Sequence, residues 1–173
     1  MATEKSNIIL IGMPGAGKST VGVILAKATS KDFVDTDLLI QIAQARPLQE
    51  IVDNDGHMAL RRIEEKVVLS INGHNLVIAT GGSAVYSDAA MKHLKRNGLA
   101  VFLDADLNTL QSRIRDFDTR GLAKRPEQDL ADLFMERYPL YDGYADVTVD
   151  CSGLTHEEVC AAILKNIKVS QLT

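Results

Sequence analysis

The chain has 173 residues, enough for one compact domain with its own core and too few for two ordinary ones. Hydrophobic residues make up 46% and charged residues 24%, the balance of a globular protein, and the net charge is −4. This acidic excess argues against a general nucleic-acid surface, which needs basic side chains to neutralise phosphates. No apolar run reaches a membrane-spanning length, and Cys151 and Cys160 have no metal-binding spacing. We expect a single cytoplasmic domain, 1–173, that binds neither nucleic acid nor membranes.

Short apolar runs alternate with helical patterns along the whole chain. The runs predict strands at 7–12, 32–35, 75–80, 99–105 and 146–151. Helical patterns occupy 18–30, 36–45, 87–97, 106–117, 129–145 and 155–167, and a further long helix begins after Gly56. Unbroken apolar strands separated by helices are typical of a buried parallel sheet. The sequence therefore predicts an α/β fold, a three-layer α/β/α arrangement with a central five-stranded parallel sheet.

The stretch GMPGAGKST (12–20) satisfies the pattern G-x-x-x-x-G-K-[ST] between a predicted strand and a predicted helix. Glycines let backbone N–H groups wrap an anion, and the helix N-terminus adds its positive dipole end. Lys18 holds the position that reaches the β- and γ-phosphates, and the Ser19 hydroxyl the position that holds Mg²⁺. A plain glycine-rich turn is the alternative, but motif, context and position together favour a phosphate site. We predict ATP or GTP with Mg²⁺, bound by Gly12, Gly15, Ala16, Gly17, Lys18, Ser19 and Thr20.

An N-K-x-D motif for guanine recognition is absent from the sequence, which argues against a GTPase switch and leaves the small-molecule kinases. Candidate acceptor residues follow the second predicted strand, where Asp35 and Asp37 would lie at the carboxyl edge of the sheet. One carboxylate could lie near Mg²⁺ while the other binds the acceptor hydroxyl. The alternative is that Asp37 only caps a helix beside an exposed Asp35.

Four further features stand out, and the first two have two interpretations each. Arg61 and Arg62 either bind a ligand or form ion pairs with Glu64 and Glu65 on a solvated helix face. Gly81 and Gly82 end a strand, which allows close approach to a ligand or forms a plain turn. Residues 118–128, DTRGLAKRPEQ, have no apolar periodicity and include Lys124 and Arg125, so we expect a mobile loop. Arg137 follows within a predicted helix.

The order of these motifs resembles the shikimate kinase family, within the nucleoside-monophosphate-kinase group of P-loop folds. That family reads G-x-x-G-x-G-K-[ST], D-[TS]-D, G-E-x-x-F-R-x-x-E, T-G-G-G, R-P-L-L and R-x-x-L-Y-x-x-x-A-D. The counterparts here are GMPGAGKST, DTD (35–37), GHMALRRIE (56–64), TGGS (80–83), RPEQ (125–128) and RYPLYDGYAD (137–146). The resemblance spans nearly the whole chain and implies a P-loop kinase fold, with an acceptor-binding helical region at 36–62 and a mobile lid at 116–128.

The resemblance also implies a role for each matching residue. Asp37 would bind and deprotonate the acceptor hydroxyl, and Asp35 would lie near Mg²⁺. Arg61 and Arg137 would bind the acceptor carboxylate, a task suited to guanidinium groups, with backbone contacts from Gly81 and Gly82. In the lid, Arg125 would stabilise the transferring phosphoryl group, and Arg120 would lie over the adenine. The implied reaction moves the γ-phosphoryl of ATP to a hydroxyl of shikimate, catalysed by a monomer with Lys18, Asp37 and Arg125 as catalytic residues.

The sequence departs from the family pattern at His57, Leu60, Ser83 and the pair Glu127–Gln128, and the segment from lid to Arg137 is short. These departures leave two alternatives open. One is a related kinase for another small hydroxy acid or metabolite. The other is a nucleotide-binding regulatory module without turnover, although retention of Lys18, Asp37 and a lid arginine argues against it.

Overall fold

Five parallel strands form one sheet in the order β2-β3-β1-β4-β5 within residues 5–170, the part of the chain that the computed structural model describes. They are β1 (Asn7–Ile11), β2 (Asp32–Asp35), β3 (Leu76–Ala79), β4 (Gly98–Asp104) and β5 (Val147–Asp150). The central strand β1 pairs with β3 and β4, and all of its residues are buried. The prediction of a five-stranded parallel sheet is confirmed; the domain ends, 1–4 and 171–173, lie outside the described residues.

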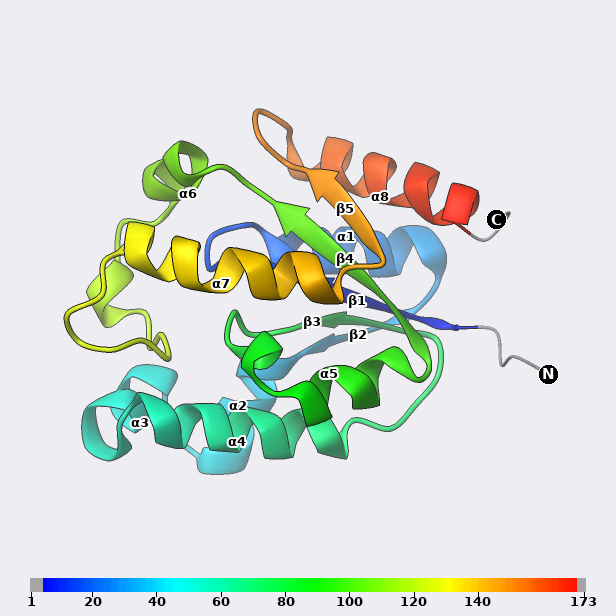
Figure 1. Cartoon of the computed structure of the whole chain (residues 1–173). Helices are drawn as coiled ribbons and strands as arrows, with labels where there is room; N and C mark the ends of the chain where they lie inside the picture. Colours follow the sequence, from blue (N-terminus) through cyan, green and yellow to red (C-terminus); the bar gives the residue numbers. More distant parts are fainter. Residues whose placement is uncertain (1–4, 171–173) are drawn as a thin grey trace.

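Helices cover both faces of this sheet and complete the three layers (Figure 1). On one face α1 (Lys18–Thr29) packs against α8 (His156–Ser170), and on the other lie α5 (Asp88–Lys95) and α7 (Leu130–Tyr144). Beside the sheet lie α2 (Thr36–Gln44), α3 (Leu48–Asp55) and α4 (His57–Ser70), and α4 packs against α5. The remaining elements are α6 (Leu107–Arg113) and two 3₁₀ turns, η1 (Ala84–Tyr86) and η2 (Phe117–Thr119). Within residues 5–170, no helix has both the length and the apolar character needed to cross a membrane.

Two hydrophobic clusters hold these layers together. The main cluster fills both faces of the sheet, with Ile9, Leu10, Phe102 and Leu103 fully or almost fully buried. A second, smaller cluster joins α2, α3 and α4 through Ile40, Ile51 and Leu60, and the buried Ala123 of the predicted lid completes it. The lid segment therefore lies against the helical region predicted to bind the acceptor.

Two element boundaries differ from the sequence prediction. The chain after Pro47 forms α3, which was not predicted as a helix of its own; Pro47 stands at its N-cap, and within its eight residues only Ile51 is buried. The helix predicted at 106–117 ends at Arg113, because Ile114 takes an extended backbone and packs its side chain against Gly15. Ile114 is 8% exposed, so burial of this side chain against the glycine loop replaces another helical turn.

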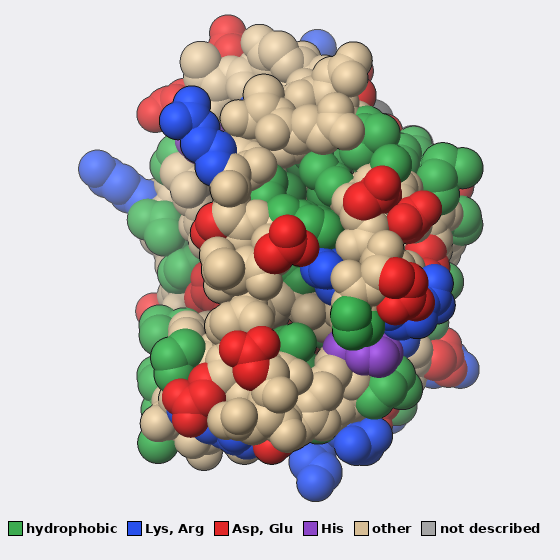
Figure 2. Space-filling model, turned by 90° about the vertical axis from the view of Figure 1, so that its left-hand side faces the viewer, with side chains coloured by type: hydrophobic (Ala, Val, Ile, Leu, Met, Phe, Trp, Pro, Cys, Tyr) green, Lys and Arg blue, Asp and Glu red, His purple; other side chains and the backbone are tan. Residues whose placement is uncertain are grey.

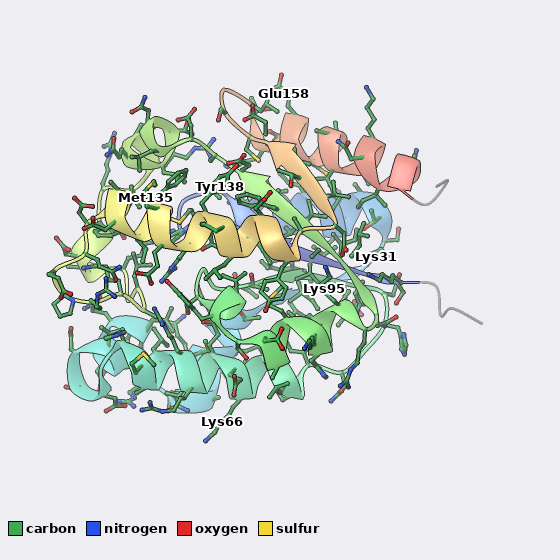
Figure 3. The ribbon with its side chains drawn as sticks, viewed as in Figure 1. Lys31, Lys66, Lys95, Met135, Tyr138 and Glu158 are labelled. Atoms are coloured by element: carbon green, nitrogen blue, oxygen red, sulfur yellow. The ribbon has the colours of Figure 1, made fainter. Side chains whose placement is uncertain are left out.

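The amino ends and the carboxyl ends of the strands carry different kinds of side chain. At the amino ends of the strands, Lys31 donates to the Ser6 carbonyl (2.8 Å) and to Asn75 Oδ1 (2.7 Å). Lys95 donates to the Tyr144 carbonyl (2.6 Å) and pairs with Asp146 (3.0 Å). Figure 3 shows both lysines at the end of the molecule away from the lid segment. These contacts join loops between strands, whereas the carboxyl edge carries the residues predicted to do the chemistry.

Candidate active site

A cavity of about 400 Å³ opens at the carboxyl edge of the sheet. Figure 2 views the molecule from the side that carries α3 and the lid segment, and there acidic and basic side chains are interspersed, with no continuous patch of either charge. The cavity wall contains the glycine loop, the loop after β3, the helices α2, α3, α4 and α7, and the lid. Its charged lining residues are Lys18, Asp37, Glu64, Arg113, Arg120 and Arg137. A recessed site with opposed cationic and anionic groups fits anionic ligands that react with one another.

The glycine loop has the conformation that a phosphate cradle needs. Gly15 and Gly17 have φ of 83° and 94°, and a Cβ on Gly15 would lie 2.6 Å from Ile114 Cγ1. Helix α1 begins directly afterwards at Lys18, so its free N–H groups face the loop. Lys18 Nζ donates to the carbonyls of Gly12 (2.7 Å) and Met13 (2.8 Å), and burial lowers its pKa to about 8. An anion at the loop would raise this pKa again, because a nearby negative charge favours the protonated ammonium group.

Asp35 at the end of β2 and Asp37 in α2 have different surroundings. The capping alternative made Asp37 the helix cap, but Asp35 is the cap. Asp35 caps α2, because its Oδ1 accepts from the backbone N–H of Asp37 (2.9 Å) and Leu38 (3.2 Å). Its Oδ2 accepts from the Ser19 hydroxyl (2.6 Å). Asp37 does not cap the helix and lines the cavity instead. Burial, followed by the nearby charge of Asp35, raises the pKa of Asp37, which makes this carboxylate a better proton acceptor.

Glu64 is the residue of this site that the sequence interpretation left on a solvated helix face. It is 3% exposed and lines the cavity, and its Oε2 accepts from the Ser83 hydroxyl. No hydrogen-bond partner among the described residues reaches its Oε1, which faces Gly81. Burial, and then the charge of Asp37, raises its pKa to about 7. The sequence feature that could have identified Glu64 is its place at the end of the motif GHMALRRIE (56–64). Its charged neighbours in sequence favoured an exposed helix face instead.

Arg137 lies at the cavity wall and is almost completely buried, at 1% exposed. Its Nη2 donates to the Ala123 carbonyl of the lid (2.9 Å), and its Nη1 would lie 2.7 Å from a Cβ on Gly82. Gly81 and Gly82, which were predicted to contact the acceptor, line the cavity. The Gly81 N–H donates to Thr36 Oγ1 (2.8 Å). Arg61 does not line the cavity: it stacks on Tyr86 and pairs with Glu136 at 3.7 Å.

The lid brings Arg120 to the cavity and keeps Arg125 outside. Arg125 is 55% exposed and pairs with Glu127 (3.1 Å) and Glu136 (3.6 Å). Arg120 lines the cavity together with Gly121, Leu122 and Ala123, and its charge acts on the pKa of both Lys18 and Asp37. The apolar residues that anchor the lid thus follow Arg120, and the Glu127–Gln128 pair is not at the cavity. The mobility of the lid stays a prediction.

Two further cavity residues were not expected from the sequence. Arg113 of α6 reaches the carbonyls of Gly15 (3.5 Å) and Ala16 (3.4 Å), and His156 of α8 lies 3.1 Å from the position of a Cβ on Gly17. Both therefore adjoin the glycine loop. Arg113 falls in a helix without a recognised motif, and His156 is the first residue of α8, which carries no recognised motif either.

The chain and its fold have counterparts among known proteins. The family model described as shikimate kinase matches residues 14–168. The chain belongs to the shikimate kinase family. Membership makes it an ATP-dependent phosphotransferase that acts on an alcohol group, as the order of motifs predicted.

Individual relatives support the assignment to the shikimate kinase family. A shikimate kinase of Thermodesulfovibrio yellowstonii is 40% identical over 162 residues, which cover 92% of this chain and 93% of the relative. A solved shikimate kinase from Acinetobacter baumannii, in complex with shikimate, has a TM-score of 0.88 at 31% identity and covers 99% of this chain and 97% of its own. The shikimate kinase of Aquifex aeolicus has a TM-score of 0.79 at 29% identity, and the match covers 96% of this chain and 98% of that one. A thymidylate kinase from Candida albicans, 14% identical with a TM-score of 0.59, shares the fold alone.

Proposed function

We propose that this protein transfers the γ-phosphoryl group of ATP to the 3-hydroxyl of shikimate, giving shikimate 3-phosphate for aromatic amino-acid biosynthesis. The observation that carries the proposal is one cavity in which Lys18, Asp37 and Arg137 all take part. Lys18 belongs to the phosphate loop, Asp37 can accept a hydroxyl proton, and Arg137 can bind a carboxylate. A hydroxy acid that carries a ring carboxylate, such as shikimate, needs the second and third of these groups together.

ATP would bind along the loop formed by Gly12, Gly15, Ala16, Gly17, Lys18, Ser19 and Thr20, with Arg113 and His156 beside it. Mg²⁺ would neutralise charge on the phosphates when bound. Ser19 and Asp35 fit it, because their oxygens already lie 2.6 Å apart and Mg²⁺ in kinases takes one or two protein oxygens besides phosphate and water. No cluster of three or more His, Cys, Asp or Glu ligands occurs among residues 5–170, so a metal held by protein alone is not part of the proposal.

The catalytic steps are divided among three side chains. Asp37 takes the proton from the acceptor hydroxyl as it attacks, and its raised pKa brings it closer to that of a useful base. Lys18 stabilises the phosphoryl oxygens. We assign the lid-arginine role to Arg120 in place of Arg125, because Arg120 lines the cavity and acts on both Lys18 and Asp37. The lid would exclude water, whose hydroxyl would otherwise consume ATP.

Arg137 binds the acceptor carboxylate in this proposal, with Arg61 beside it and with Gly81 and Gly82 forming the floor. A monomer that works in the cytoplasm stays a prediction.

The test is an assay of ATP consumption with shikimate, with product identified by mass spectrometry. Wild-type protein should phosphorylate shikimate, and Asp37→Asn should lower kcat by about 10²–10⁴-fold while leaving ATP affinity nearly unchanged. Asp32→Asn is the matched control, since Asp32 is exposed at the start of β2, the end of that strand remote from Asp37. Absence of turnover with shikimate, but turnover of another hydroxy acid, would overturn the proposed acceptor. Loss of ATP binding in Asp37→Asn would overturn the role of Asp37.

A further inference from the structure

Arg61 and Arg137 share a support that is not itself part of the cavity wall. The guanidinium carbon of Arg61 lies 3.5 Å from the centre of the Tyr86 ring, and that of Arg137 lies 5.3 Å from it. Arg137 Nε also donates to the Tyr86 hydroxyl oxygen at 3.3 Å. Two cationic groups from α4 and α7 therefore meet on one aromatic side chain of η1.

Glu136 anchors the hydroxyl end of that ring. The Tyr86 hydroxyl donates to Glu136 Oε1, and Arg61 Nη2 lies 3.7 Å from the same oxygen. The other carboxylate oxygen, Oε2, accepts from Gln128 Nε2 at 2.7 Å and lies 3.6 Å from Arg125 Nη2. Glu136 thus links the stacked arginines to the end of the lid.

The charges explain why such a support is needed. Two guanidinium groups beside each other repel, and each long arginine side chain loses rotamer freedom when it is fixed. The negative face of an aromatic ring attracts a cation, and a carboxylate within ion-pair distance compensates part of the charge. Tyr86 and Glu136 together hold both guanidinium groups in place before a carboxylate arrives, which lowers the cost of ordering them on binding.

We propose that Tyr86 is a positioning residue for the two arginines that recognise the acceptor carboxylate, with Glu136 as its anchor. The proposal rests on the proposed function, because it takes the acceptor to be a carboxylate bound by Arg137 and Arg61. Tyr86 acts through these arginines and makes no contact with the reacting atoms, so it should govern carboxylate recognition and leave phosphoryl transfer largely unaffected.

The experiment compares two acceptors, shikimate and its methyl ester, which lacks the negative charge. Four proteins are assayed: wild type, Tyr86→Phe, Tyr86→Leu and Tyr144→Phe. Tyr144 is the matched control, because it is the last residue of α7 and its hydroxyl donates to Asp88 of α5. Tyr86→Phe keeps the ring and removes the hydroxyl, and Tyr86→Leu removes both. Thermal unfolding checks each variant, and Tyr86→Phe decides the question if the leucine variant does not fold.

Wild type should prefer shikimate to the ester in kcat/KM. Tyr86→Phe should reduce this preference about tenfold, mainly through KM for shikimate, and Tyr86→Leu should reduce it further. The kcat and the KM for ATP should change less than about threefold, and Tyr144→Phe should match wild type. A residue that only supported the fold would lower activity on both acceptors equally, so an unchanged preference in Tyr86→Phe overturns this inference alone. A wild type that phosphorylates neither acceptor overturns the proposed function and the inference together.

Discussion

Replacement of Gly81 by alanine should disable the acceptor side of the site while leaving the nucleotide side intact. A Cβ on Gly81 would lie 2.3 Å from Glu64 Oε1 and 2.7 Å from Asp37 Oδ1, where real contacts stay above 3.0 Å. The backbone of Gly81 is not in the positive-φ region, so alanine adds no backbone strain. The side chains must therefore give way. Because Glu64 is buried against Ser83, Asp37 and the loop end of β3 also have to adjust.

The size of the effect follows from the displacement. Moving a reacting group by a distance on the order of 1 Å can cost about 10²-fold in rate, and Asp37 is the proposed base. We expect kcat/KM for shikimate to fall about 10²-fold in Gly81→Ala, equivalent to roughly 2.7 kcal/mol of transition-state stabilisation. The dissociation constant of ATP should stay within about twofold, since Gly12–Thr20 is untouched.

Steady-state kinetics with shikimate, together with calorimetric titration of ATP, measure both quantities. Gly143→Ala is the control, because a Cβ at this exposed helical position meets no atom within 4 Å. It should retain full activity and unfold at the same temperature or higher. Gly81→Ala with near wild-type turnover would refute the placement of Asp37 and Glu64 around the acceptor, and equal losses in turnover and ATP binding would show a general disruption.

Two further predictions concern the lid and a buried carboxyl group. Arg120→Ala should lower kcat about 10³-fold or more, whereas Arg125→Ala should stay within a few-fold of wild type; steady-state kinetics showing equal losses would contradict the lid assignment. Burial raises the pKa of Glu64 to about 7 from 4.5, so its contribution to stability is complete below about pH 4.5 and is lost as the pH rises through 7. Between pH 5 and pH 8, the free energy of unfolding measured with urea should fall by roughly 2–3 kcal/mol more in wild type than in Glu64→Gln. Parallel pH profiles of the two proteins would contradict the raised pKa of Glu64.

The fold and the nucleotide side could be predicted because local patterns determine them. The five strands are short apolar runs, and their parallel pairing follows from the helices between them. The glycine loop needs its residues consecutive in the chain, so its whole geometry is present in GMPGAGKST (12–20). Asp37 and Arg137, which were named from the order of recognisable motifs, both line the cavity, and their roles stay predictions.

The remaining residues depend on packing that no local pattern records. Arg120 and Arg125 lie five residues apart in a segment without periodicity, and contacts between the lid and distant elements, such as the burial of Ala123 against α2–α4, accompany the placement of Arg120 at the cavity. Glu64 has charged neighbours in sequence, yet the approach of Gly81 and Ser83, in the loop after β3, buries it against α4. Arg61 matches its motif, but its guanidinium group lies outside the cavity and stacks on Tyr86, a residue in no motif.

Asp35 has a consequence for how this site keeps its dimensions. One of its oxygens starts α2, and the other faces Ser19, the proposed partner in metal binding. The same hydrogen bonds that begin the helix fix Asp37 only two residues further on. The backbone spacing between the proposed metal ligand and the proposed base is therefore set by one turn of helix. Other residues of the acceptor pocket can therefore differ for another substrate while the backbone spacing between Asp35 and Asp37 stays the same.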